Sequence, residues 1–209
     1  MPGTLRHWSE LLDLSAETVS VAVVGTNGPE RLDIEVRLIA ADDVERVADF
    51  FAAVPDGDRT FFKEDASDPA VVATWAAADA PHRLIALADD RVVGYVAVLK
   101  GVGWSGHVGE LRLVVSPEYR QRGIGRLLAQ RAVVEALELG VVKLVVDVVA
   151  GQDRLFDMFT KLGFEQEGRL RRHVRSTAGE THDLLILSHF VDELAASLAT
   201  PSPTVGDDD

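Results

Sequence analysis

The stretch YRQRGIGR, residues 119–126, combines two glycines spaced by one residue with three arginines. A strand-like run, ELRLVVSP, leads into it, and a helix-like run, LLAQRAVVEALEL, follows it. Glycines let a backbone come close to a ligand, and the amides at a helix N-terminus bind anions. Arg120, Arg122 and Arg126 add positive charge at the same place. The pattern predicts a cradle for an anion such as a pyrophosphate.

Two other nucleotide-binding loops do not fit this spacing. A Walker loop requires G-x-x-x-x-G-K-[ST], which the sequence does not contain. A dinucleotide fingerprint requires a third glycine at position 128, where this chain has leucine. The following helix, predicted over 123–139, has one wide apolar face made of Leu128, Ala129, Ala132, Val133, Ala136 and Leu139. We therefore expect the anion site at the fixed N-terminus of a packed helix.

Two carboxylates on neighbouring predicted strands are candidates for a general base. Asp147 is the only charged residue after Lys143 in the run VVKLVVDVV, and a carboxylate among apolar neighbours gains base strength through desolvation. The alternative for Asp147 is a structural acid that binds a backbone group or an arginine. Glu110 shares a strand face with Arg112, so a base and a surface ion pair are both open for it.

The composition restricts the chemistry. A chain of 209 residues with 47% hydrophobic content suits one domain with a real core and at most a small appendage. It has no cysteine, which excludes disulfides, zinc–thiolate sites and a cysteine nucleophile. The net charge of −13 disfavours nucleic acid and anionic membranes and favours cationic partners such as amines, although it also serves solubility. With no signal-like N-terminus and no long apolar run, we expect a cytoplasmic protein.

The elements that must position these residues follow from hydrophobic periodicity and turn residues. We expect strands in IEVRLIA, HRLIALAD, RVVGYVAVLKG, residues 107–115, KLVVDVV, GFEQEGRLRRHV and THDLLILSHFV. Helices are expected in ADDVERVADFFAAV, DPAVVATWAAADA, 123–139 and DRLFDMFTKLG. Asp89 and Asp90 form a hairpin turn, and the apolar run KLVVDVV predicts a strand buried on both faces. The fold class is α/β, a mixed and mostly antiparallel sheet with a central β-α-β crossover and flanking helices.

Three stretches together resemble the GNAT superfamily of acyl-CoA-dependent N-acyltransferases: LRLVVSPEYRQRGIGRLL, KLVVDVV and QDRLFDMFTKLGF. The family signature, [RQ]-x-x-G-x-[GA] after a strand ending in V-x-P, is matched by Arg120, Gly123, Gly125, Val115 and Pro117. The resemblance runs from about residue 33 to 190. It implies a sheet of the GNAT type and an acyl-CoA, in the simplest case acetyl-CoA, as co-substrate.

The resemblance also implies roles for individual residues. Family members bind the coenzyme A pyrophosphate through the loop, which assigns cofactor binding to Arg120, Gln121, Arg122, Gly123, Ile124, Gly125 and Arg126. The end of the preceding strand, here Val114 and Val115, pairs with the pantetheine amides. Some relatives carry a catalytic glutamate at the place of Asp147. Phe61, Phe62 and Glu64 stand where acceptor loops lie in the family, and the two phenylalanines serve equally well as a core plug.

Two positions depart from the family pattern. Members often have an asparagine after the buried strand and, seven positions on, a tyrosine that protonates the leaving thiolate; here these places hold Gln152 and Phe159, which remain assigned to cofactor binding. Phenylalanine cannot donate a proton. Because a thiol also leaves as its thiolate, this loss costs at most about 10²–10⁴ in rate. Water, Thr160 and Tyr119 remain open as substitutes.

The sequence thus predicts a cytoplasmic N-acetyltransferase in which a primary amine, of a small molecule or a protein, attacks the thioester directly, with Asp147 or Glu110 as base. A non-catalytic acyl-CoA-binding module is the alternative, and a purely structural domain would leave the cradle unexplained. The expected partners are acyl-CoA and the amine, with a homodimer left open and no metal, nucleic acid or membrane. Residues 1–32 are expected to be an extension, 33–199 the GNAT domain, and 200–209 a disordered acidic tail.

Overall fold

The computed structural model describes residues 18–25, 28–55, 64–77, 82–176 and 178–191. Its strands are β1 (Thr18–Gly25), β2 (Gly28–Leu38), β3 (Arg83–Ala88), β4 (Arg91–Lys100), β5 (Val108–Val115), β6 (Lys143–Val149), β7 (Glu165–Arg175) and β8 (Thr181–Phe190). They form one sheet in the order β1-β2-β3-β4-β5-β6-β8-β7. All neighbours are antiparallel except β5 and β6, which are parallel. The predicted mixed, mostly antiparallel sheet is confirmed.

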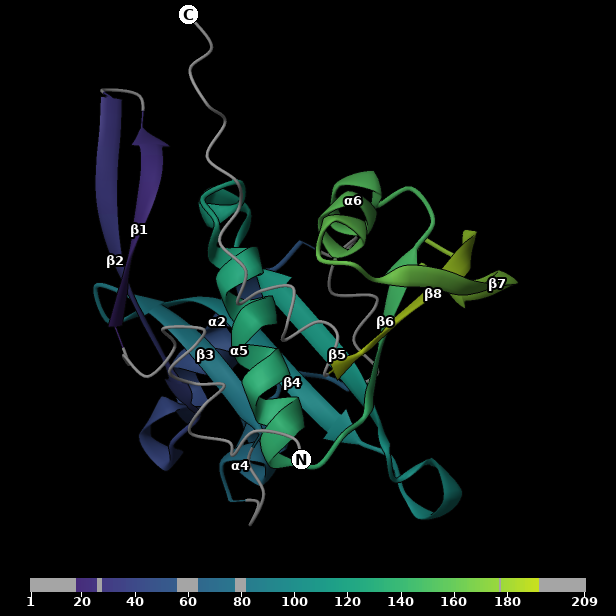
Figure 1. Cartoon of the computed structure of the whole chain (residues 1–209). Coiled ribbons are helices and arrows are strands. Elements are labelled where there is room, and N and C mark those ends of the chain that lie inside the picture. The colour runs from purple at the N-terminus through teal and green to yellow at the C-terminus, as the bar shows by residue number, and fades with distance from the viewer. Residues whose placement is uncertain (1–17, 26–27, 56–63, 78–81, 177, 192–209) are drawn as a thin grey trace, which may run out of the picture.

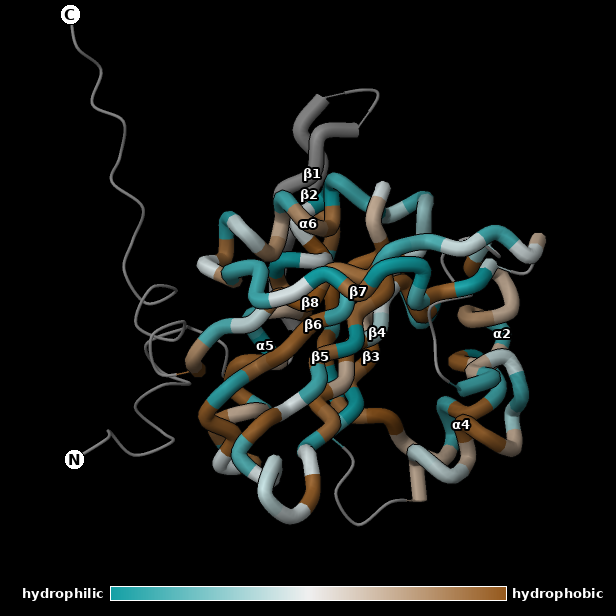
Figure 2. Tube along the Cα trace, turned by 90° about the vertical axis from the view of Figure 1, so that its right-hand side faces the viewer, coloured by the Kyte–Doolittle hydropathy of each residue, from teal (hydrophilic) through white to brown (hydrophobic). Residues whose placement is uncertain are grey.

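Helices cover both faces of the sheet, as Figures 1 and 2 show. Helix α5 (Ile124–Glu138) connects β5 to β6 and packs on β4 and β5 from one side. Helices α2 (Val44–Ala53) and α4 (Pro69–Ala76) pack together on the other side, where α2 contacts β4. Helix α6 (Asp153–Lys161) follows β6. The connection β5-α5-β6 is the predicted central crossover.

Each face of the sheet has its own apolar cluster. The α5 face buries Leu111, Val115, Leu128, Leu144 and Phe159 among others. The opposite face buries aromatic rings under α2 and α4, and there the rings of Phe51 and Tyr95 meet edge to face with centroids 5.2 Å apart. Burying large apolar and aromatic side chains is the main source of stability for such layers. The sheet is therefore held from both sides over its centre.

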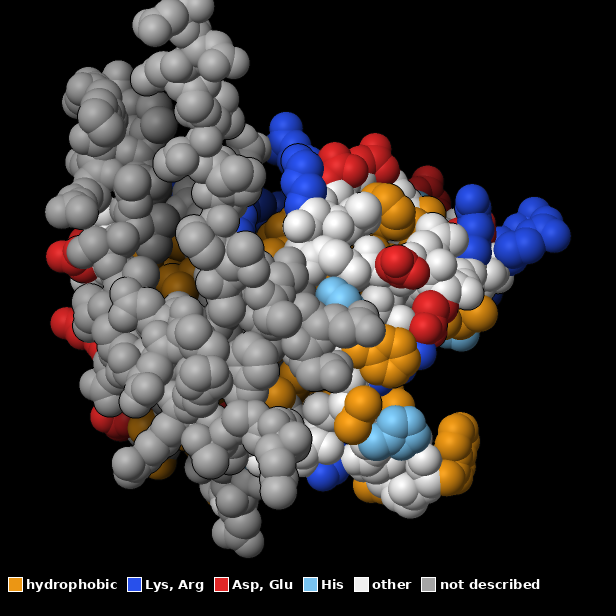
Figure 3. Space-filling view, viewed as in Figure 1, with side chains coloured by type: hydrophobic (Ala, Val, Ile, Leu, Met, Phe, Trp, Pro, Cys, Tyr) orange, Lys and Arg blue, Asp and Glu red, His pale blue; other side chains and the backbone are white. Residues whose placement is uncertain are grey.

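The predicted elements agree with the structure in most places. Asp89 and Asp90 both have positive φ and form the β3–β4 turn, as expected. The predicted apolar face of α5 is buried except at its last member, Leu139, which is half-buried. The Arg-rich strand β7 pairs with β8 in an exposed hairpin, where Arg169 contacts Asp183 at 2.7 Å. Lys and Arg side chains project at that end of the molecule in Figure 3.

The prediction that KLVVDVV is buried on both faces is wrong. Leu144, Val146 and Val148 are buried toward α5, whereas Lys143, Val145 and Asp147 are only half-buried. The reason is the position of β6 beyond β5: α2 packs on β4 instead. One face of β6 is therefore accessible, and that face carries Asp147.

A buried ion pair fixes the start of α2 to the end of β2. The Asp43 side chain is 0% exposed and accepts hydrogen bonds from the Arg37 guanidinium through both oxygens and from the Ala40 amide at 2.8 Å. Arg46 Nε lies 3.2 Å from Asp43 Oδ1. Burial alone would raise the pKa of Asp43, but the Arg37 and Ala40 hydrogen bonds and the two arginine charges outweigh it and hold the pKa below its usual range.

The predicted domain limits remain a prediction. Strand β2 runs from Gly28 to Leu38, and β1 pairs with it along its first part, so a hairpin spans the expected limit at residue 32. This hairpin extends from one edge of the sheet in Figure 1. The expected acidic tail at 200–209, Phe61 and Phe62 lie outside the described residues.

Candidate functional site

A groove opens where β5 and β6 separate. The two strands pair over only three residues each, 108–110 with 143–145, and diverge beyond Glu110 and Val145 (Figure 1). The groove has a volume of about 820 Å³, which lies within the usual range for small-molecule sites. Residues 110–115 of β5, the loop before α5, Val146 and Asp147 of β6, and residues 151–155 with Met158 and Phe159 line it.

The loop before α5 presents its backbone to this groove. Gln121 and Gly123 have positive φ values of 61° and 81°, a conformation that turns successive amides toward one side. Gly123 is the N-cap of α5 and offers no side chain to cap the helix. The first intrahelical bond runs from the Leu127 amide to the Gly123 carbonyl, so the amides of residues 124–126 precede the helical ladder. These amides and the helix dipole favour an anion.

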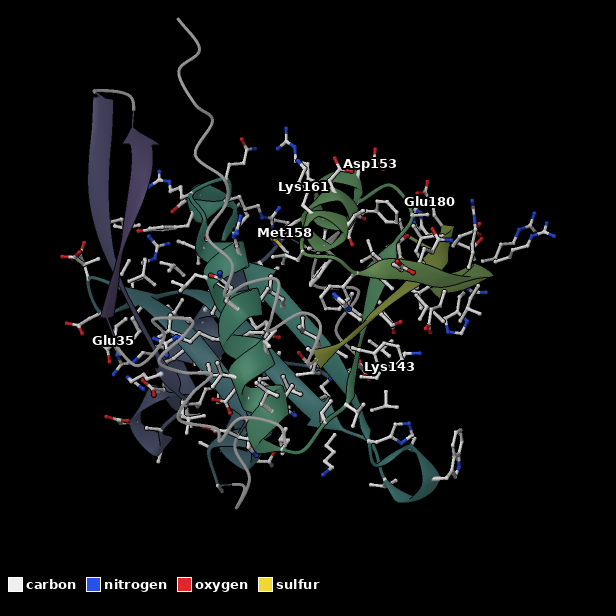
Figure 4. All side chains as sticks on the ribbon, in the orientation of Figure 1. Glu35, Lys143, Asp153, Met158, Lys161 and Glu180 are labelled. Carbon is white, nitrogen blue, oxygen red and sulfur yellow. The ribbon has the colours of Figure 1, made fainter. Side chains whose placement is uncertain are left out.

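Two arginines, and a glycine that lies close to a side chain of α6, complete this end of the groove. Arg120 and Arg126 are among the lining residues, and Arg120 Nε also donates to the Val115 carbonyl at 3.0 Å, which ties the loop to the end of β5. A Cβ atom at Gly125 would lie 3.1 Å from Met158 Sδ. In Figure 4, Met158 lies on the side of α6 toward α5. The lack of a side chain at 125 therefore keeps the groove open between the two helices.

Nine of the eleven residues predicted to bind a cofactor lie along the groove. They are Val114, Val115, Arg120, Gln121, Gly123, Gly125, Arg126, Gln152 and Phe159. The other two have different surroundings. The Ile124 side chain is 1% exposed in the core, so only its backbone can face a ligand. Arg122 lies over the Tyr119 ring at 5.2 Å.

Gln152 and Phe159 border the groove at the α6 side. Gln152 is the N-cap of α6, and its side-chain oxygen accepts from the Val149 amide at 3.3 Å. The Phe159 ring is 0% exposed and packs edge to face on Phe164, with centroids 5.0 Å apart. Thr160 and Tyr119, the proposed substitutes for the missing acid, are not among the described residues that line the groove. Thr160 Oγ1 instead donates to the Phe156 carbonyl.

The two candidate bases, Glu110 and Asp147, both line the groove at the end away from the arginine loop. Both are half-buried, and they come from strands that are neighbours in the sheet. Glu110 Oε1 accepts a hydrogen bond from Arg112 Nε at 2.9 Å, so the ion pair foreseen as one alternative is present. The groove thus has a cationic, backbone-rich end and an end lined by two carboxylates from neighbouring strands.

Several lining residues have no counterpart in the sequence predictions. Arg154 and Met158 come from α6, and Leu111 and Leu113 come from β5. Arg154 adds positive charge to the groove lining, but in the sequence it resembles any solvent-facing arginine of an amphipathic helix. The positions of Met158 and Leu113 depend on how α6 covers the open strands. No local motif encodes that placement.

A second group of polar and charged residues adjoins the carboxylate end. The family resemblance had placed Glu64 in an acceptor loop, whereas no sequence pattern connected Arg83 or Tyr95 with the site. Arg83 Nη1 donates to the Tyr95 hydroxyl at 2.5 Å, and its guanidinium lies 4.4 Å from the Trp75 ring centroid. Glu64 Oε2 is 3.6 Å from Arg83 Nη2, and Glu64 Oε1 is 3.4 Å from Arg112 Nη1. Burial raises the pKa of Tyr95 to about 12, so its hydroxyl stays neutral.

Two other features are absent from the described residues. No group of three or more His, Cys, Asp or Glu side chains in this part of the chain is arranged to hold a metal ion. None of the described helices combines the length and apolarity needed to cross a membrane.

Comparison with known sequences identifies a family. A sequence model of the Acetyltransferase (GNAT) family matches residues 48–164, more than half of the chain. A [ribosomal protein bS18]-alanine N-acetyltransferase of Salmonella typhimurium is 32% identical over 76 residues, which make up 36% of this chain and 51% of that protein. The chain thus matches about half the length of this curated relative.

Solved structures share the fold. A putative acetyltransferase from Salmonella typhimurium, solved with its cofactor acetyl-CoA, superposes with a TM-score of 0.67 at 17% identity, over 83% of this chain and 99% of that one. A ribosomal-protein-alanine N-acetyltransferase from Brucella melitensis gives 0.64 at 24% identity, over 74% and 98%. A putative phosphinothricin N-acetyltransferase gives 0.65 at 21% identity, over 76% and 98%. At these identities the likeness concerns the fold.

Proposed function

The chain belongs to the GNAT family of acetyltransferases, and from this premise we propose that it transfers the acetyl group of acetyl-CoA to a primary amine. It is an acyl-CoA-dependent acetyltransferase with acetyl-CoA as co-substrate. The observation that carries the proposal for this chain is the groove between β5 and β6, with a backbone anion site at one end and two carboxylates at the other. A donor with a charged tail and a reactive thioester fits this polarity.

The residues of the groove suit coenzyme A. The amides of residues 124–126, with Arg120 and Arg126, would hold the pyrophosphate. Glycine at 125 leaves the space that a side chain would fill against Met158. Beyond the three-residue ladder, β5 has an edge toward the groove on which Val114 and Val115 would pair with pantetheine amides.

The thioester supplies an activated acetyl group, which passes to the amine nitrogen while the sulfur leaves. The chain contributes three things to this step: it aligns the two substrates, it excludes water with the apolar walls formed by Leu111, Leu113 and Phe159, and it offers a base. Asp147 and Glu110 are the candidates for taking the amine proton. With phenylalanine at 159, the sulfur leaves as thiolate or is protonated by water.

The acceptor, the cellular location and the oligomeric state remain proposals. A relative that is similar over half its length carries the name of a ribosomal-protein alanine acetyltransferase, and one structural neighbour is named for phosphinothricin. These names leave both a protein N-terminus and a small amine open. We retain the cytoplasm as the expected compartment and a homodimer as an open alternative.

Titration calorimetry with coenzyme A and acetyl-CoA tests the donor site. Gly125→Val should weaken binding at least about a hundredfold, or about 2.7 kcal/mol, because its side chain would enter the groove. Gly168→Val is the matched control, because Gly168 lies in β7 and a Cβ there would make only ordinary contacts, the nearest at 3.7 Å from Ile186. Unchanged affinity in a folded Gly125→Val protein would contradict the donor site. Binding without turnover on any amine would select the non-catalytic module instead.

A further inference from the structure

We propose that Arg83 and Arg112 form a carboxylate-binding site for the acceptor, and that Glu64 occupies this site in the free protein. The inference rests on the proposed acetyl transfer and specifies its acceptor as a small amine that carries a carboxylate, such as a free amino acid. A peptide N-terminus, whose nearest carbonyl is an uncharged amide, would not use such a site.

The register of three strands brings the two arginines to one place. Arg83 of β3 pairs with Ala97 of β4, and Ala97 pairs with Arg112 of β5, so the three residues form one row across the sheet. Paired residues point to the same face, and alternate strands lie roughly 10 Å apart. The small Ala97 side chain between them is 0% exposed. Two guanidinium groups therefore face a common position over Ala97.

Other side chains hold both arginines in place. Arg83 is fixed by its 2.5 Å hydrogen bond to the Tyr95 hydroxyl and by the Trp75 ring beneath its guanidinium. Arg112 is fixed by its 2.9 Å hydrogen bond to Glu110. Burial would lower the pKa of Arg112, but the hydrogen bond and charge of Glu110 and the charge of Glu64 raise it, so it stays charged. Guanidinium groups that are fixed in advance bind a carboxylate at a smaller cost in entropy.

Glu64 lies between the two arginines without completing the interaction. Its oxygens are 3.4 Å from Arg112 Nη1 and 3.6 Å from Arg83 Nη2, and neither contact is a hydrogen bond. Within the part of the chain that the structure describes, Glu64 Oε2 and Arg112 Nη1 are buried and have no hydrogen-bond partner. Buried polar atoms normally have partners, and an arginine normally binds a carboxylate through short, paired bonds. A ligand carboxylate in the place of Glu64 could make the missing bonds.

The position of the site connects it to the reaction. Arg112 lines the groove together with Glu110 and Asp147, the two candidate bases. In an α-amino acid the ammonium group is only one carbon away from the carboxylate. A carboxylate bound at Arg112 therefore places the amine near the acidic end of the groove, where it can lose a proton and meet the acetyl group. The two arginines compensate the charge of the acceptor carboxylate, and the two acids attract its ammonium group.

Pairs of acceptors that differ at the carboxylate test the proposal, with each kcat/KM expressed per concentration of neutral amine, because an amino acid and its amide differ in amine pKa. L-alanine, L-methionine and L-phenylalanine would be compared with their C-terminal amides, both as acetyl acceptors and as ligands that raise the melting temperature. We expect kcat/KM for at least one amino acid to exceed that of its amide about tenfold or more, since the site loses a charged hydrogen-bond pair with the amide. Arg112→Gln should reduce this preference by raising KM for the amino acids much more than for their amides.

Glu64→Gln tests the competitor role on a side chain that is 34% exposed, so that the loss of its charge should cost little stability. It should lower KM for the preferred amino acid about two- to fivefold, the worth of an internal ion pair of this exposure, with kcat unchanged. Arg91→Gln is the matched control for the arginine, because Arg91 forms an exposed ion pair with Glu118. A higher KM for amino acids in Glu64→Gln would show that Glu64 supports the arginines and would overturn the competitor role.

The outcomes separate this inference from the proposed function. Equal kcat/KM for acids and amides would overturn the carboxylate site and leave acetyl transfer intact. If no amine is acetylated but the acids raise the melting temperature of the wild type and not of Arg112→Gln, the carboxylate site stands and the proposed function fails. If no amine is acetylated and no acid raises the melting temperature, both the carboxylate site and the proposed function are overturned.

Discussion

Two arginine–carboxylate clusters lie on the same face of the sheet and differ in how completely their hydrogen bonds are made. Arg37 pairs with Ile85 across the β2–β3 ladder, which places it on the α2 side, and both oxygens of its partner Asp43 accept hydrogen bonds. In the other cluster, Glu64 contacts Arg83 and Arg112 at 3.4–3.6 Å without a hydrogen bond. The first carboxylate is 0% exposed, whereas the second is 34% exposed.

The difference indicates what each cluster does. Removing a charge from water is costly, and a complete set of hydrogen bonds is what makes a buried charge tolerable. The Asp43 cluster has that set and joins two elements of the fold. The Glu64 cluster leaves buried donors and acceptors unmatched beside a groove, which a structural role does not require. We infer that the completed cluster supports stability and the incomplete one supports binding.

The largest expected effect is on stability at Asp43. Asp43→Asn removes the buried partner of the Arg37 guanidinium, which keeps only its contact with Glu35 at 3.0 Å. Because breaking a buried pair costs about 3–5 kcal/mol, we expect a loss near the lower end of that range. Glu64→Gln is the matched carboxylate-to-amide control and should change the free energy of unfolding by less than about 1 kcal/mol. Urea unfolding of both variants at pH 7 measures the contrast. Equal losses would mean that both clusters are structural.

The pH dependence of stability tests the role of Asp43 further. Because the folded-state pKa of Asp43 is lowered, its contribution to stability is present above the unfolded value of about 3.9 and is lost as pH falls through the folded pKa. Wild-type stability should therefore fall more steeply below about pH 4 than that of Asp43→Asn, which lacks this carboxylate. Parallel curves for the two proteins would contradict the role of Asp43.

Most of the fold could be predicted because its signals are local. The Asp89–Asp90 turn, the apolar face of α5 and the run KLVVDVV each specify an element within a few residues. The error at KLVVDVV has a physical origin: an apolar run does not report whether a helix covers each face. The helix in ADDVERVADFFAAV could be predicted from its pattern, whereas the buried pair between Asp43 and Arg37 depends on the approach of β2 to α2.

The two ends of the groove also differ in how much of each could be predicted from the sequence. The anion loop is one continuous motif, so Gly123, Gly125 and Arg120 could be assigned from the sequence. The arginine pair depends on the register of three strands and on a loop residue, Glu64, that is distant in the chain. Sequence spacing contains no information about that row. Glu110 could be foreseen as a base or as an ion pair with Arg112, but its position in the groove needed the fold.

The second largest effect concerns the base and separates catalysis from positioning. Asp147→Asn should lower kcat/KM about a hundredfold at a pH well below the amine pKa and recover as the pH approaches that value, because a base is needed only while the neutral amine is scarce. Glu110→Gln should instead raise KM for amino acids at every pH, since Glu110 holds Arg112. The measurement is a pH profile of kcat and KM with one active acceptor.

Two results would revise this assignment. A rate loss at low pH in Glu110→Gln, with Asp147→Asn parallel to wild type, would make Glu110 the base. Profiles of unchanged shape for both variants would leave deprotonation to water. Glu180→Gln serves as the control, because Glu180 is an exposed carboxylate near the β7–β8 turn in Figure 4, and its profile should match wild type.

The smallest expected effect comes from adding a buried hydroxyl at Phe159. It tests whether a buried polar group without a hydrogen-bond partner lowers stability. Phe159 is 0% exposed and packs on Phe164 at 5.0 Å, so the tyrosine hydroxyl of Phe159→Tyr would be buried at the groove wall. We expect a loss of about 1–3 kcal/mol in the free energy of unfolding, seen as a lower melting temperature, with no gain in kcat. Phe190→Tyr, on a ring that is 48% exposed, controls for the substitution itself. An unchanged melting temperature together with a higher kcat would show that the hydroxyl reaches the groove and supplies the proton that Phe159 cannot.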